Sequence, residues 1–425
     1  MKRIKIFSVL ILVFLIQKVD GQSAPLTLEQ CYELARQNFP LIKQKDLIAQ
    51  SKEYSIANVH SGNLPQVTLI AQATYQSDVT KVSIDNPAFP KIQPLSKDQY
   101  KIYAEINQSL YDGGAIKRSS ALQEANAQAE DQKIEVELYK IRDRINQLYF
   151  GVLLLDQQQN QISLLQKDIK VSQAKVKASI ENGVAFRMNA DILEAELLKT
   201  DQRIIEIKAS RRAFIEMLSL FIDQTLSETV SLQEPLNIEI QASDDISRPE
   251  LSLFNYQRQL VRGQYELTTS RTQPRAGLFL QAGYGKPGLN MLKNEFAPYA
   301  IGGLRLSWNL SGFYNSSREK QMLDINTRSI DTQQELFMLN TKVSLRQTSA
   351  EVNKLEDLIR IDEQLIQLRT KIKSTAQAQL DNGVITANDF LRELNAEDQA
   401  KQNLLLHKTQ LSMASYSYQN ISGRN

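Results

Sequence analysis

The sequence predicts an α+β membrane protein that is internally duplicated, with strand pairs and long helical hairpins in each half. Two observations support this fold class. First, each half contains a pair of short segments in which apolar and polar residues alternate. Second, each of these pairs is followed by more than 60 residues without proline. Beyond the N-terminus there is no run of 18 apolar residues. Any membrane crossing is therefore expected to be made by strands, whose alternation hides them from hydropathy averages.

Residues 1–21 have the features of a secretory signal peptide. A basic start at 2–5 is followed by a mostly apolar stretch at 6–16, which is too short to span a bilayer. Cleavage after Gly21 changes the formal net charge from +2 to −1. This near-neutral balance argues against a nucleic-acid partner, which requires a basic face. The single cysteine, Cys31, excludes an intramolecular disulfide.

Each half of the chain repeats the other. Three segments of the first half recur in the second at offsets of 198 to 209 residues. They are 64–75 with 273–284, 106–114 with 304–312, and the Asn-Gly-Val of 182–184 with that of 382–384. Each half therefore reads as strand, loop, strand, long helix, tight turn and returning helix. The expected divisions are a signal peptide at 1–21, a first repeat at 22–222, an equatorial segment at 223–249 and a second repeat at 250–425.

Four strands are expected, each about 10 to 12 residues long, the length that crosses a membrane at a tilt. They lie at 64–76, 99–111, 274–285 and 299–310. Aromatic residues stand at their ends, as in the interfacial girdles of membrane barrels. These residues are Tyr75, Tyr100, Tyr284, Tyr299 and Trp308. A small soluble antiparallel sheet would show the same alternation, and the aromatic residues favour the membrane interpretation.

Two helices of about 65 residues, each roughly 100 Å long at 1.5 Å per residue, are expected after the strand pairs. The stretches from Ala115 to about Ile180 and from Phe313 to about Leu380 contain no proline and only one glycine. Apolar residues recur along both at coiled-coil spacing. They are Leu148, Leu155, Ile162, Ile169 and Val176 in the first, and Leu358, Ile361, Leu365, Leu368 and Ile372 in the second. The Asn-Gly turns fold each helix back on an antiparallel partner, which excludes an ordinary dimeric coiled coil.

Four strands per chain are too few for a barrel. An open edge in hydrocarbon would leave backbone groups unsatisfied at a cost of several kcal/mol each. Two copies would give eight strands, whose interior is filled by side chains, whereas three would give twelve, which leave room for a channel. The sequence therefore predicts at least a dimer and favours a homotrimer with a 12-stranded transmembrane β-barrel.

A family resemblance adds to this reading. Residues 26–40 (LTLEQCYELARQNFP) resemble the opening L-t-L-e-e-a-l-x-x-A-x-x-n-n-P of the TolC-type outer-membrane efflux proteins. The duplicated strand pairs, the glycines before each long helix, and the turns followed by 191–195 and 389–391 resemble that family as well. The resemblance covers essentially the whole mature chain. It implies a barrel in the outer membrane of a Gram-negative cell, continued into the periplasm by a long α-helical (coiled-coil) barrel.

The resemblance also implies a function and partners. It indicates the exit duct of a tripartite efflux or type I secretion system, a passive conduit that contacts outer-membrane lipid. The implied partners are a periplasmic adaptor (membrane fusion) protein and an inner-membrane pump of the RND, ABC or MFS type. The segment 223–249 would belong to an equatorial belt. A non-conducting, periplasm-spanning scaffold anchored in the outer membrane is the alternative, but the Gln, Thr, Ser, Lys and Glu side chains on one strand face favour the duct.

No enzyme, cofactor or metal site is expected. The two histidines, His60 and His407, lie far apart in the sequence, and no glycine-rich phosphate loop is present. Cys31 is expected to be a small buried residue of the first helix rather than a nucleophile.

The candidate aperture residues are Asp389, Arg392 and Asp191. Asp389 follows the second turn, and the resemblance implies a ring of three carboxylates at this position in a trimer. The family's second acidic ring, one turn later, falls on Arg392, so Asp389 and Arg392 could instead pair. The competing interpretation is that Asp389 caps its own helix, where the helix dipole favours an acid. The sequence leaves both open.

The candidate adaptor-docking tips are the turns themselves. They comprise Asn182, Gly183, Val184, Asn382, Gly383 and Val384. Val184 and Val384, and Phe186 beside the first turn, would place apolar side chains at exposed tips, which globular proteins seldom leave in water. Gly183 and Gly383 are expected to supply the positive φ that the turns demand.

Overall fold

The computed structural model describes residues 25–81, 94–236, 238, 240 and 245–424. The expected signal peptide lies outside the described residues, as do Pro87 and Pro90 of the first loop between strands. The chain forms two compact units. The hairpin unit comprises 1–35, 145–238 and 357–413, and the sheet unit comprises 36–144, 239–356 and 414–425. Each unit takes segments from both sequence repeats, because the long helices run through both units.

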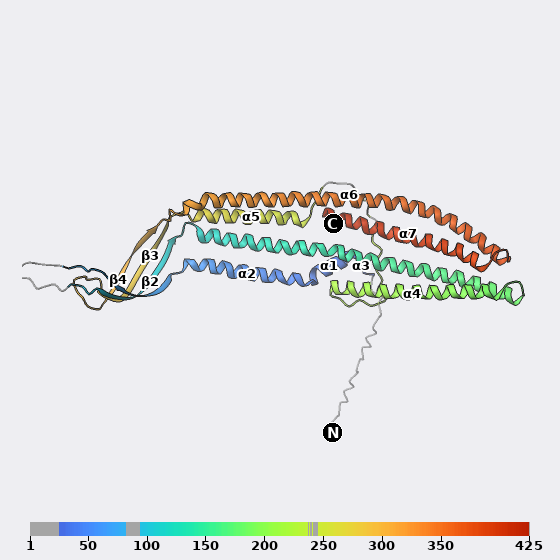
Figure 1. The fold of residues 1–425 in the computed structure, drawn as a ribbon, viewed down its shortest axis with the longest axis horizontal. Helices are drawn as coiled ribbons and strands as arrows, with labels where there is room; N and C mark the ends of the chain where they lie inside the picture. The colour runs from blue at the N-terminus through green and yellow to red at the C-terminus, as the bar shows by residue number, and fades with distance from the viewer. Residues whose placement is uncertain (1–24, 82–93, 237, 239, 241–244, 425) are drawn as a thin grey trace, which may run out of the picture. The chain divides into compact units, whose positions relative to one another are not determined.

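The sheet unit contains one four-stranded antiparallel sheet in the order β1-β2-β3-β4 (Figure 1). The strands are β1 (Gln66–Tyr75), β2 (Asp98–Tyr111), β3 (Arg275–Lys286) and β4 (Ala297–Ser307). The two repeats meet at the centre of the sheet, where β2 pairs with β3. Strands β1 and β4 therefore form its two edges, each with one side unpaired within the chain.

The strand register separates an apolar face from a polar face. Ala71 lies opposite Ile102, and Ile102 lies opposite Tyr284, so alternate positions of neighbouring strands share a face. The apolar face is open to the surroundings: Leu69 is 72% exposed and Leu304 is 77% exposed. The polar face carries a network centred on the Glu105 carboxylate. This amphipathic pattern is what the period-two alternation predicted.

Two details of the expected strands are corrected. Tyr299 lies opposite Gly283 on the polar face, and its ring centroid is 6.4 Å from that of Tyr103. Its position has the opposite parity from the apolar residues of β4, so it does not join an aromatic girdle on the apolar face. The last strand was expected to reach residue 310, but β4 ends at Ser307. Trp308 follows the strand and donates its indole N–H to the carbonyl of Thr272 at 3.0 Å.

Long helices make up most of the described chain. They are α1 (Leu28–Asn38), α2 (Lys43–His60), α3 (Ala115–Glu181), α4 (Arg187–Ile222), α5 (Pro249–Ser270), α6 (Gly312–Asp381) and α7 (Ala387–Ser422). Two short 3-10 helices, η1 (Pro40–Ile42) and η2 (Ser61–Asn63), flank α2. Helices α3 and α6 contain 67 and 70 residues, close to the expected length. Among the described residues, none of the helices has the length and apolarity needed to cross a membrane.

In the sheet unit, a shorter helix accompanies each long one. Lys45 of α2 forms an ion pair with Glu135 of α3 at 2.5 Å. Arg258 of α5 forms one with Asp331 of α6 at 3.0 Å, and α5 lies along α6 in Figure 1. These contacts place a helix beside each strand-to-helix junction.

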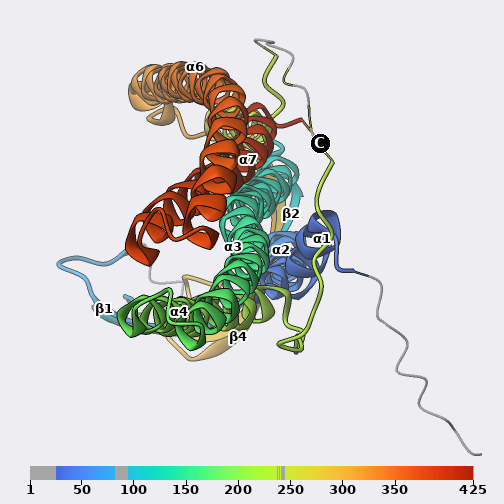
Figure 2. The same ribbon diagram turned by 90° about the vertical axis from the view of Figure 1, so that its right-hand side faces the viewer.

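In the hairpin unit, α4 folds back along α3 and α7 along α6 (Figures 1 and 2). The seam expected on α3 is confirmed: Ile162 and Ile169 are fully buried, Leu148 and Val176 nearly so, and only Leu155 is partly exposed.

The apolar stripe expected on α6 is largely exposed. Ile361 and Leu368 are each 58% exposed, whereas Ala376, Leu380 and the carboxylate of Asp362 occupy the buried side of this helix. The stripe has coiled-coil spacing, yet it does not pack against α7. Its apolar surface stays exposed within the described part of the chain.

The first part of the equatorial segment is fastened to the hairpin unit. Helix α4 ends at Ile222, and Asp223 adopts a left-handed φ of 51°. The Arg211 guanidinium donates to the Val230 carbonyl at 2.8 Å. Leu26 forms a parallel bridge with Leu232, so the residues just before α1 lie against this segment.

Candidate functional site

Both hairpin turns are built in the same way, 200 residues apart. Gly183 and Gly383 have φ angles of 75° and 68°. The amide of Val184 donates to the Ser179 carbonyl at 2.9 Å. This six-residue bond and the left-handed glycine define a Schellman motif, which satisfies the last carbonyls of the preceding helix. A side chain would meet no atom within 4 Å at either glycine, so conformation rather than crowding requires glycine.

The tips carry exposed apolar side chains. Val184 is 74% exposed, Val384 is 69% exposed and Phe186 is 81% exposed. The two turn asparagines are engaged with the backbone. Asn182 donates to the Ala178 carbonyl at 3.0 Å, and Asn382 does the same to Ala378 at 2.7 Å. The valines and Phe186 are therefore the side chains of the turns that are most available for contact.

Asp389 forms a capping box at the start of α7. Its amide donates to the Thr386 hydroxyl at 3.2 Å, and its carboxylate accepts from the Thr386 amide at 3.2 Å and hydroxyl at 2.7 Å. Both partners thus satisfy donors that the first helical turn leaves free. The hydrogen bonds from Thr386, and then the charge of Arg392, hold the pKa of Asp389 below its usual value of 3.8.

The other two aperture candidates lie apart from this box. Arg392 is exposed, and within the chain it pairs with Glu393 at 3.1 Å rather than with Asp389. Asp191 lies exposed on α4.

Asn189 is a residue of this site that the sequence reasoning missed. Its side-chain oxygen accepts from the amide of Ala387 at 3.3 Å, so the first hairpin caps α7, the returning helix of the second hairpin. Asn189 stands 200 residues before Asp389, at the same place in the repeat. The two equivalent positions thus cap the same helix, one from within its own turn and one from the neighbouring turn.

A shared apolar core lies behind the turns. Leu193 of α4 and Phe390 of α7 are both fully buried in it, and Ile169 and Val176 of α3 contribute from the first hairpin. Two ion pairs flank this core and join α3 to α6. Lys175 pairs with Asp381 at 2.7 Å, and Lys373 pairs with Asp168 at 3.0 Å. The tips of one chain therefore form a single packed structure.

A buried carboxylate lies deeper along α7. Glu397 is 2% exposed, accepts from the Thr370 hydroxyl at 2.7 Å, and pairs with Lys401 at 3.0 Å and Lys373 at 3.2 Å. Burial acts to raise the pKa of Glu397, but these hydrogen bonds and charges outweigh it, so the pKa lies below its usual value. A charged group at this depth is tolerated because each of its oxygens has a partner.

The cysteine and one of the two histidines are engaged in contacts within the chain. Cys31 is fully buried, and burial together with the charge of Glu29 raises the pKa of its thiol to about 12, which makes it a poor nucleophile. His407 forms a contact of 2.6 Å with Asp362 on α6. In the described part of the chain, no three His, Cys, Asp or Glu residues gather in a way that would hold a metal ion.

The Asp389→Asn variant is expected to loosen the first turn of α7, because the capping carboxylate is lost. A group with a lowered folded-state pKa stabilises the fold above its unfolded pKa and loses that effect as the pH falls through the folded value. In the wild type, amide protection at Thr386, after correction for intrinsic exchange, should therefore decrease as the pH is lowered past 3.8. In the variant it should be low and independent of pH. Asp191→Asn on α4 is the control, and equal protection in wild type and Asp389→Asn contradicts the cap.

Comparison with known proteins finds a family match for part of this chain. Residues 31–219 match the model of the family described as outer membrane efflux protein. No curated protein sequence matches the chain significantly.

Three solved structures have a similar fold at low sequence identity. VceC from Vibrio cholerae is 14% identical with a TM-score of 0.65, over 94% of this chain and 96% of its own. The CmeC outer membrane channel of Campylobacter jejuni is 13% identical with a TM-score of 0.65, over 93% and 85%. The MtrE outer membrane channel of Neisseria gonorrhoeae, solved in its open state, is 12% identical with a TM-score of 0.65, over 93% and 88%.

The likeness extends over both repeats, although the family model covers only the first. Through residues 31–219 the chain matches the outer membrane efflux protein family, and over nearly its whole length it has a fold similar to that of the TolC-type outer-membrane channels.

Proposed function

We propose that the protein is the outer-membrane exit duct of a tripartite efflux or type I secretion system. In this function it passively conducts solutes that an inner-membrane pump of the RND, ABC or MFS type delivers through a periplasmic adaptor protein. The match of residues 31–219 to the efflux family supports the channel class. The two repeats, 22–222 and 250–425, would each contribute one strand pair and one helical hairpin, with 223–249 as part of an equatorial belt.

The observation that carries this proposal is the exposed apolar face of an open-edged sheet. Val67 and Leu69 of β1 are 67% and 72% exposed, and Leu304 and Leu306 of β4 are each 77% exposed. A sheet in water would hide such a face. In a bilayer the same face contacts lipid and the polar face lines a lumen, provided that further strands satisfy the edges of β1 and β4.

Exposed stripes in the hairpin unit support the homotrimer. The α6 stripe, with Ile361 and Leu368, has a counterpart on the first hairpin. There Leu164 of α3 is 59% exposed, and Leu198 and Ile205 of α4 are 62% and 68% exposed. Packing α6 of one copy on the first hairpin of the next would bury both stripes. The sheet requires the same arrangement, because β4 of one copy must pair with β1 of the next. Three copies give twelve strands and a channel, whereas two give a filled barrel.

The tips would form the periplasmic end of the duct. We propose that Val184 and Val384 contact the adaptor, with Asn182, Gly183, Asn382 and Gly383 shaping the turns. Asp389 would stand near the aperture as one of three symmetry-related carboxylates while capping α7. Unchanged ion selectivity and unchanged block by cations in Asp389→Ala channels would contradict the ring and leave the capping role alone.

Conductance of the purified protein in planar bilayers tests the duct. We expect discrete channels from a trimeric species, with the trimer established by chemical crosslinking in detergent. A trimer that inserts into the bilayer but carries no current would refute the duct and favour the non-conducting scaffold. Its insertion would be checked independently by protease accessibility of the loop between β3 and β4.

A further inference from the structure

The polar face of the sheet carries more positive than negative charge. By the strand register, its charged side chains are Lys101 and Glu105 of β2, Arg275 of β3 and Arg305 of β4. Strand β1 contributes only uncharged residues to this face. They are Gln66, Thr68, Ile70, Gln72 and Thr74. The face therefore has a surplus of two positive charges per chain.

One cation and the anion neutralise each other. Arg305 pairs with Glu105 at 3.2 Å, and its guanidinium carbon lies 4.6 Å from the ring centroid of Phe279. Asn107 and Gln281 donate to the same carboxylate at 2.9 and 2.7 Å. The opposite charges of Glu105 and Arg305 cancel, and Phe279, Asn107 and Gln281 hold the pair in place. The pair therefore adds little net charge to the polar face.

The two remaining cations, Lys101 and Arg275, have no counter-charge among the described residues. Neither forms an ion pair with any residue of the chain that the structure describes, and both side chains are exposed. Lys101 lies opposite Gln72 on β1 and Gly285 on β3. Arg275 is the first residue of β3, opposite Ser307 of β4. The uncompensated charge is therefore placed near both ends of the polar face.

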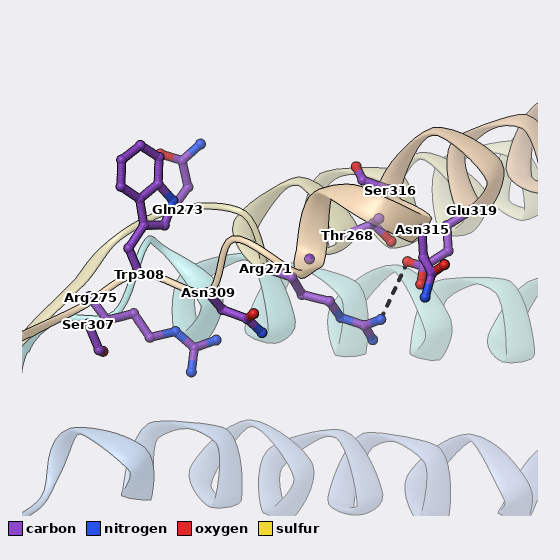
Figure 3. Close-up of a pocket in the computed structure, with 11 residues that line it drawn as sticks. Thr268, Arg271, Gln273, Arg275, Ser307, Trp308, Asn309, Asn315, Ser316 and Glu319 are labelled. Carbon is purple, nitrogen blue, oxygen red and sulfur yellow. Dashed lines mark hydrogen bonds and ion pairs between the residues drawn. The ribbon is translucent and has the colours of Figure 1, made fainter.

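Arg275 is open to solutes as well as to water. It lines a cavity of about 590 Å³ at the junction of the strands with α5 and α6, together with Asn309. The other arginine of this cavity, Arg271, is partly neutralised by Glu319 at 3.5 Å. Figure 3 shows the side chains of Arg275 and Trp308 extending in opposite directions from the strand ends. The cation thus belongs to the polar side and the indole to the apolar side.

We infer that Lys101 and Arg275 make the lumen of the sheet region attract anions, so that they are specificity-determining residues and the duct favours anionic solutes. The inference rests on the proposed duct, in which the polar face lines the lumen. Low-dielectric walls focus the field of fixed charges into a narrow passage, and rings of basic side chains select anions. Three copies repeat each cation around the axis. The neutral Glu105–Arg305 pairs lie between the two cationic positions.

The test is the reversal potential of the full-length trimer in a planar bilayer under a KCl gradient. Substituting Lys101→Gln and Arg275→Gln together should lower the permeability ratio of chloride to potassium by about two- to five-fold. Glu105→Gln should change the ratio in the opposite direction, because it releases the charge of Arg305. These two opposite shifts would not both follow from a general loss of folding.

Lys286→Gln is the matched control. Lys286 belongs to the same strand as Arg275 but lies opposite Tyr100 on the apolar face. It should leave the ratio unchanged. Conducting trimers whose ratio is the same in the wild type and the double variant would overturn the inference while leaving the duct intact. A wild-type trimer that inserts without conducting would refute the duct, and the inference with it.

Discussion

Truncating the Phe390 side chain is expected to destabilise the hairpin tips strongly. Phe390 is fully buried in the apolar core that Leu193, Ile169 and Val176 share behind the turns. Phe390→Ala leaves a cavity that elements from two hairpins cannot easily close, so we expect a loss of about 3–5 kcal/mol. The measurement is the free energy of local opening by native-state hydrogen exchange, at amides of α4 and α7 behind the turns.

The chain offers a matched control for this variant. Phe186 has the same side chain and follows the first turn, but it is 81% exposed. Phe186→Ala should change the opening free energy by less than about 0.5 kcal/mol, because an exposed side chain leaves no cavity. Similar effects of the two substitutions would show that Phe390 does not pack as described. A small effect of Phe390→Ala alone would mean that the two hairpins separate readily at their tips.

Charging the two tips is expected to abolish efflux while the trimer persists. Val184 and Val384 are exposed in the chain, so Val184→Asp with Val384→Asp should cost little folding stability. If these side chains dock on an adaptor, each aspartate must lose its hydration in an apolar contact, which is strongly unfavourable. The measurement is the drug susceptibility of the native host carrying the variant gene, which should approach that of the deletion strain.

Two controls separate docking from assembly. Crosslinking of the variant in detergent should give the same proportion of trimer as the wild type. Leu47→Asp introduces the same charge at a residue of α2 that is 61% exposed, far from the turns in sequence, and should leave susceptibility near the wild-type value. Wild-type resistance in the double variant, with the protein at normal levels, would refute docking through these valines.

Local patterns were sufficient to predict the elements. Strict alternation located the strands because successive side chains of a strand point to opposite faces, and the absence of proline set the length of α3 and α6. The Asn-Gly pairs located the turns because a left-handed residue there must be glycine or pay a steric cost. The heptad on α3 was correctly assigned to the core. The heptad on α6 has the same spacing, but Ile361 and Leu368 turned out to be exposed.

This difference marks the limit of pattern reading. Spacing indicates that a stripe is suited to packing, but it does not identify the partner. For α3 the partner is another helix of the chain, and for α6 it is proposed to be a second copy. Tyr299 was misassigned for a related reason, because its parity within β4 follows from the register with Gly283 and not from its position at a strand end.

The sequence by itself determined that this protein has four amphipathic strands, two long helical hairpins and a duplicated order, because those features arise from neighbours along the chain. Only the tertiary structure decided which side chains from distant parts of the chain contact one another. Asn189 capping the helix of the other hairpin, Asp389 engaged with Thr386, and Glu105 neutralising Arg305 across three strands all depend on distances between segments remote in sequence. Hydrogen bonds and ion pairs act over a few ångströms, so their partners are fixed by packing and register.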